Sequence, residues 1–75
     1  MAWEVRFFAD RRAFGGAPRG GGRCLFDAEA DALTHARILL DRAPKGCAEV
    51  FHRDAGRRAV YRLRAGRMVA LAHPP

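Results

Sequence analysis

The chain contains no serine and only one threonine, Thr34, so it has few hydroxyl groups for covalent chemistry. An enzyme usually needs a nucleophile beside a base, or two carboxylates that converge in a cleft. A predicted helix start and its polar face explain the acids at 27, 29, 31 and 41, and predicted strands contain Glu4 and Glu49. We therefore expect no enzymatic activity, no catalytic residue, no cofactor and no small-molecule substrate.

No apolar run approaches the roughly 20 residues of a membrane-spanning helix. Residues 1–6 also lack the basic-then-apolar pattern of a secretion signal. These two absences predict a soluble, cytoplasmic protein that has no membrane partner.

Cysteine and histidine are too few, and wrongly spaced, for a disulfide framework or a metal site. Cys24 and Cys47 bracket a predicted helix that would be about 24 Å long. A disulfide needs Cα atoms within about 7 Å, so we expect reduced thiols. The three histidines, His35, His52 and His73, have no metal-ligand spacing, and we expect no bound metal.

A strong positive charge is the main feature of this short chain. Its 75 residues carry 14 Lys and Arg against 8 Asp and Glu, a net charge of +6. Such a charge favours anionic partners, although a GC-rich genome would also raise the arginine content. Segment 27–43 has a net charge of −2, so the excess of positive charge lies in the rest of the chain. We expect residues 1–75 to form one small basic domain.

The residue pattern predicts one long helix and several short strands. Residues 3–9 alternate as a strand, and 10–22 form a Gly/Arg-rich loop before a short strand at 23–26. The helix is expected from an N-cap at Asp27 to about Arg42, before Pro44 and Gly46. Three further strands are expected at 48–53, 57–63 and 67–73.

Two repeats of Ala-Gly-Arg, at 55–57 and 65–67, predict three-residue hairpin turns between these last strands. Such turns pair Arg53 with Arg57 and Leu63 with Arg67. Phe51, Tyr61 and Val69 would then face the helix. The predicted fold is α+β, a two-layer β-α-β-β-β arrangement with one helix packed on one face of a mainly antiparallel sheet of about four strands.

Because one helix covers only one face, the opposite face is predicted to be open. Its apolar residues would form a protein interface, which favours protein–protein association, including a homodimer. The residues assigned to this interface are Val50, Val60, Met68, Ala70 and Phe8.

Nucleic-acid backbone binding, to RNA or DNA, is the alternative hypothesis. Arginines on the sheet and in the Gly/Arg-rich loop would neutralise phosphates, whereas Phe8 alone offers a ring for base stacking. The arginines assigned to this role are Arg6, Arg11, Arg12, Arg19, Arg23, Arg58, Arg62 and Arg64. A third possibility is an ordinary solvated sheet face on which arginine stems cover scattered valines and alanines.

Overall fold

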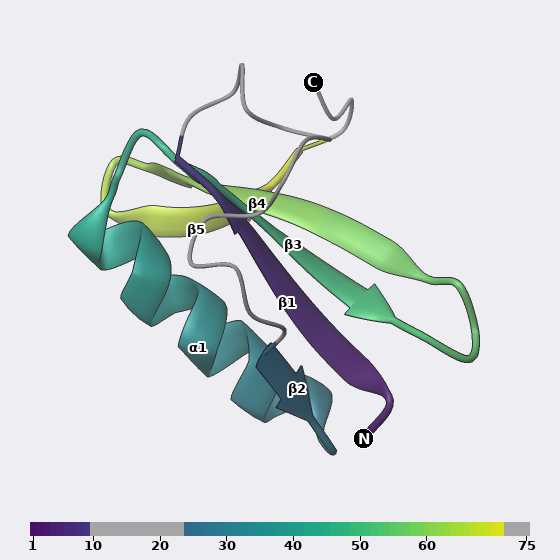
Figure 1. The fold of residues 1–75 in the computed structure, drawn as a ribbon. Coiled ribbons are helices and arrows are strands. Elements are labelled where there is room, and N and C mark those ends of the chain that lie inside the picture. Colours follow the sequence, from purple (N-terminus) through teal and green to yellow (C-terminus); the bar gives the residue numbers. More distant parts are fainter. Residues whose placement is uncertain (10–23, 72–75) are drawn as a thin grey trace.

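The computed structural model, which describes residues 1–9 and 24–71, contains one helix and five strands. In chain order they are β1 (Trp3–Phe8), β2 (Cys24–Phe26), α1 (Glu29–Arg42), β3 (Cys47–His52), β4 (Arg58–Arg64) and β5 (Arg67–Ala70). The strands form one antiparallel sheet in the order β2-β1-β3-β4-β5, and α1 lies across one face of it (Figure 1). The predicted α+β fold is confirmed, and the sheet has five strands because the short β2 pairs with β1.

Small side chains let α1 approach the sheet closely. Ala32, Ala36 and Leu40 recur at helical spacing, are fully buried and pack mainly against β1 and β3. The sheet contributes Val5 and Val50 to the same core, together with other buried side chains of β1 and β3. At 14 residues, α1 is too short to cross a bilayer.

The start of the helix differs from the prediction. Ala28 is the N-cap residue and makes no side-chain capping bond. The carboxylate of Asp27 lies 3.5 Å from the N-terminal ammonium of Met1 instead. The predicted N-cap at Asp27 is therefore wrong, because this carboxylate bonds to the chain terminus rather than to helix N–H groups.

The predicted hairpin register is wrong by one residue at both turns. Phe51 pairs with Arg58, and Arg64 pairs with Arg67. Two residues, Ala65 and Gly66, close the second hairpin with φ angles of 51° and 76°, as in a type I′ turn. Five residues, 53–57, separate β3 from β4, so the two identical tripeptides form different turns.

This shift exchanges the two faces of β3 and β5. Phe51 and Val69 lie on the face away from α1, which we call the reverse face, whereas Val50 and Met68 lie on the helix side. Tyr61 is on the helix side as predicted. A one-residue change of register moves every side chain of a strand to the other face.

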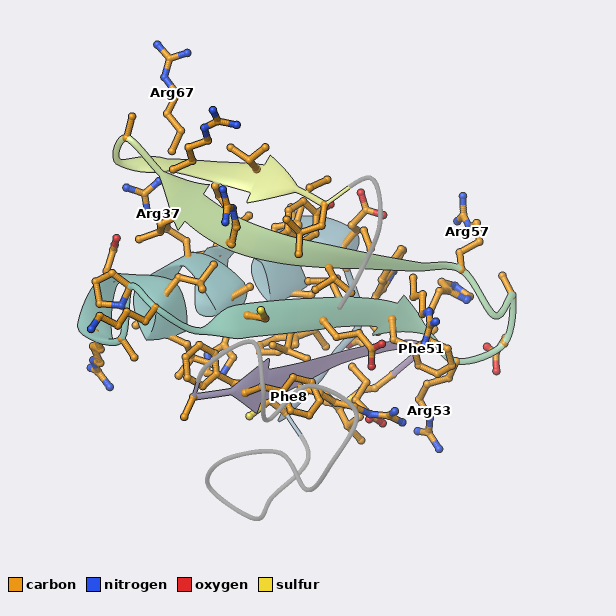
Figure 2. The ribbon with its side chains drawn as sticks, turned by 90° about the horizontal axis from the view of Figure 1, so that it is seen from above. Phe8, Arg37, Phe51, Arg53, Arg57 and Arg67 are labelled. Carbon is orange, nitrogen blue, oxygen red and sulfur yellow. The ribbon has the colours of Figure 1, made fainter. Side chains whose placement is uncertain are left out.

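One side-chain contact joins the helix to the second turn. The guanidinium of Arg37 donates from Nη2 to the carbonyl oxygen of Gly66 (2.9 Å) and from Nε to Asp41 (3.0 Å). Figure 2 shows Arg37 and Arg67 at the same end of the sheet. The β4–β5 turn is therefore anchored to α1.

We expect Ala65→Asn to stabilise the fold by about 1 kcal/mol, because alanine is strained at positive φ whereas Asn-Gly suits a type I′ turn. Chemical denaturation would measure the change in the free energy of unfolding. Ala55→Asn is the matched control, since Ala55 lies in the other loop and has no positive φ. Equal effects at both positions would contradict the assigned turn.

Gly46 is predicted to tolerate no side chain. A Cβ atom there would lie 2.7 Å from the carbonyl oxygen of Phe8 and would also overlap the ring of Phe7. Gly46→Ala should therefore cost about 1–3 kcal/mol, the usual range for overpacking a core. Gly56→Ala is the control: alanine would also be strained there, at φ 68°, but the position has open space around it. NMR shifts of the Phe7 ring should therefore change in Gly46→Ala and stay unchanged in Gly56→Ala.

Candidate nucleic-acid interface

The β3–β4 hairpin carries two arginines at the end of the sheet. His52 N–H donates to the carbonyl oxygen of Arg57 (2.6 Å), and Gly56 N–H donates to that of His52 (2.9 Å). Ala55 N–H donates to His52 Nδ1 (2.9 Å), so the imidazole also supports the loop. Arg53 and Arg57 are both exposed, and Figure 2 shows them at this end of the sheet with Phe51.

Trp3 lies beside this hairpin because β1 pairs with β3. Trp3 is opposite His52 in the register, and the two rings meet edge to face with centroids 4.8 Å apart. Arg53 N–H donates to the carbonyl oxygen of Ala2 (2.7 Å), which extends the pairing by one step. The guanidinium of Arg57 lies 6.0 Å from the centroid of the Trp3 ring, at the limit of a cation–π contact.

A half-open pocket of about 150 Å³ lies on the helix side of this end. Val50 and Ala59 are directly opposite each other in the register, and both line it. Trp3 and Tyr61 supply aromatic surface, Arg57 and Arg58 supply two positive charges, and Glu29 supplies one negative charge. The pocket therefore combines flat rings with polar groups at its margin.

Two buried carboxylates lie on the reverse face at the same end. Glu4 is 2% exposed and Glu49 is 4% exposed. Arg6 donates from Nε to Glu4 (2.5 Å), and its Nη1 is 3.5 Å from Glu49. Nη1 of Arg58 is 3.3 Å from the other Glu49 oxygen. Arg6 and Arg58 therefore pair with the two carboxylate oxygens of Glu49.

Arg6 is the centre of this cluster. The hydrogen bond to Glu4 raises the pKa of Arg6, partial burial opposes that shift, and the charges of Glu4 and Glu49 add to it. Its guanidinium also lies 5.3 Å from the centroid of the Phe51 ring. Arg6 therefore stays protonated, and its charge is used inside the fold.

Other arginines are not paired with a carboxylate in the described part of the chain. Within residues 1–9 and 24–71, five arginines of β4, β5 and the β3–β4 loop form no ion pair. These are Arg53, Arg57, Arg62, Arg64 and Arg67. Three are on the reverse face, and two are at the end of the β3–β4 hairpin.

The apolar interface predicted on the open face is not assembled as expected. Val50 is buried in the core beneath α1, and Met68 packs against the same core. Phe8 and Val60 do lie on the reverse face, but they are only 3% and 1% exposed. Ala70 is exposed, at the edge of the helix side. The predicted placement of Val50, Met68 and Ala70 is wrong because of the register shift.

The predicted cationic residues have three different settings. Arg6 and Arg58 are on the reverse face in ion pairs with buried glutamates. Arg62 and Arg64 share that face. The remaining four, Arg11, Arg12, Arg19 and Arg23, lie outside the described residues.

The sequence did not indicate the aromatic part of the site. Phe8, the ring predicted for stacking, is buried, whereas Trp3, Phe51 and Tyr61 are half-exposed. An assumed two-residue turn at Ala65-Gly66 would have given the correct face for β5. The pocket lining joins residues of β1, α1, β3 and β4, and no local pattern marks such a combination.

The described part of the chain contains no group of three or more His, Cys, Asp and Glu side chains that could hold a metal ion. Cys24 and Cys47 are not joined to each other by a disulfide. His35 is half-buried, with the centroid of its ring 5.2 Å from that of Phe26.

No protein-family model, no curated protein and no solved structure matches this chain. Function must therefore be inferred from the side chains of the site and their geometry.

Arg6→Ala is expected to destabilise the fold by about 3 kcal/mol, because it leaves Glu4 buried without its cation. Arg62→Ala is the control on the same face, and as a substitution outside any ion pair it should cost less than about 0.5 kcal/mol. Denaturant unfolding of both variants would measure the difference. Equal losses would show that the carboxylates do not depend on Arg6.

Proposed function

We propose that this chain binds single-stranded nucleic acid at the end of the sheet formed by the β3–β4 hairpin. We call this surface the hairpin-end site. It consists of Trp3 and Tyr61 on the helix side, Phe51 on the reverse face, and the hairpin arginines Arg53 and Arg57. The observation that supports it most directly is the pocket in which Trp3, Tyr61 and Arg57 meet.

Arg53 and Arg57 would bind the phosphate backbone. Both are exposed and neither forms an ion pair with a described residue, so a phosphate would not have to displace a carboxylate. By contrast, Arg6 and Arg58 are already bound to buried glutamates. The net charge of +6 adds a general attraction for polyanions.

The rings of Trp3 and Tyr61 would bind a base. Proteins that bind single strands combine a basic surface with aromatic side chains on which bases stack. A pocket of about 150 Å³ is small compared with the roughly 300–1,000 Å³ of sites for drug-sized ligands. It therefore suits one flat ring rather than a complete ligand, and only an unpaired base is free to enter it.

The reverse face supports nucleic acid better than an apolar protein interface. Phe8 and Val60 are buried there, so they offer little surface to a partner. Arg62 and Arg64 are on the same face without ion pairs among the described residues. A long strand could reach these arginines after leaving the hairpin-end site.

Trp3 is the single tryptophan of the chain and reports directly on its own site. Titration of the whole protein with a mixed-sequence single-stranded oligonucleotide should quench its fluorescence at low salt. A duplex of the same sequence should bind more weakly, because its bases are not free to stack. Equal affinity for both, or no affinity for either, would overturn the proposal.

Two variants separate the electrostatic part from the stacking part. The double variant Arg53→Gln, Arg57→Gln should make the negative slope of log K against log salt shallower by about 1.4, because two single-strand phosphate contacts are lost. Arg42→Gln with Lys45→Gln removes the same charge at the far end of α1 and should leave the slope nearly unchanged. Tyr61→Leu should weaken binding about 10-fold, within the range for one stacked base, with little change in slope.

A further inference from the structure

Among the described residues, the outer side of β5 is an unpaired edge of the sheet. β5 is the last strand in the sheet order, and no described strand pairs with its outer side. Leu71 N–H donates to the carbonyl oxygen of Val60 (2.7 Å). Along an antiparallel pair every second residue is hydrogen-bonded to the neighbouring strand, so this bond shows which residues of β5 bond to β4. Arg67 and Val69 therefore direct their peptide groups toward β4, whereas Met68 and Ala70 direct theirs outward.

The side chains along this edge differ between the two faces. On the reverse face lie Arg67 and Val69, and Val69 is 38% exposed. The neighbouring strand adds Arg62 and Arg64 to that face. On the helix side, Met68 and Ala70 are apolar. The edge is therefore basic on one face and apolar on the other.

Arg64 and Arg67 are directly opposite each other, which is an unfavourable placement for like charges. Within the described residues, neither of them nor Arg62 is neutralised by an acidic side chain. Anionic groups placed on this face would relieve the repulsion.

We propose that β5 receives an extended acidic segment of a partner protein as a sixth strand. The outward N–H and C=O groups of Met68 and Ala70 supply the main-chain hydrogen bonds, as in other cases of strand addition. Side chains alternate along a strand, so the segment has acidic residues beside Arg67 and apolar residues beside Met68 and Ala70. The partner is thus a chain in which acidic and apolar residues alternate.

A second copy of this chain fits the edge less well. The copy would bring its own Arg67, Arg64 and Arg62 to the same face, and each copy has a net charge of +6. Exposed edge charges can also protect a sheet from unwanted pairing. The experiment therefore distinguishes an acidic segment from self-pairing and from a purely protective role of Arg67.

The test is an NMR titration of the whole chain with a capped eight-residue peptide of alternating glutamate and valine. We expect shifts and slower hydrogen exchange at the amides of Met68 and Ala70. A peptide of the same composition in two blocks, and one of alternating lysine and valine, should bind at least 10-fold more weakly. No effect at these amides, or equal binding of all three peptides, would overturn the proposal.

Two variants test the main-chain and charge contributions separately. Ala70→Pro removes an outward N–H while leaving the ladder with β4 intact, and it should abolish binding. Arg67→Glu should weaken the binding of the glutamate peptide at least 10-fold and strengthen the binding of the lysine peptide. Binding unaffected by both substitutions, or concentration-dependent shifts of the same amides without peptide, would refute the inference. Nucleic-acid affinity should stay unchanged in Ala70→Pro, so this test is independent of the hairpin-end site.

Discussion

The register of the β3–β4–β5 meander is the constraint on which the surfaces of this protein depend. Because Phe51 pairs with Arg58 and Arg64 pairs with Arg67, four arginines of β4 and β5 share the face away from α1. The same register puts Tyr61 on the helix side, where it lines a pocket with Trp3. A register shifted by one residue would leave the β4 arginines on that face but would replace Arg67 and Val69 of β5 by Met68 and Ala70.

The class of fold could be predicted from the sequence, whereas the site could not. The helix breakers Pro44 and Gly46 and the short alternating strands are local patterns, and they predicted the α+β arrangement. Hairpin register depends on turn geometry, and Ala65 adopts a positive φ that its residue type does not suggest. One such turn was enough to misplace Met68 and Val69.

The burial of Glu4 and Glu49 shows how the arginines divide into two groups. Arg6 and Arg58 neutralise these carboxylates and belong to the fold. Arg53 and Arg57 lie outside this cluster and form no ion pair with a described residue. Net charge alone does not make this distinction, because every arginine contributes equally to it.

The hydrogen bond from Arg37 to the carbonyl oxygen of Gly66 links the helix layer to the outermost strand. The tip of the β4–β5 hairpin cannot fray without releasing this guanidinium, which also bonds to Asp41 within α1. Local opening at the sheet margin is therefore coupled to the second half of the helix. Whatever stiffens one of these two elements reduces the fluctuations of the other.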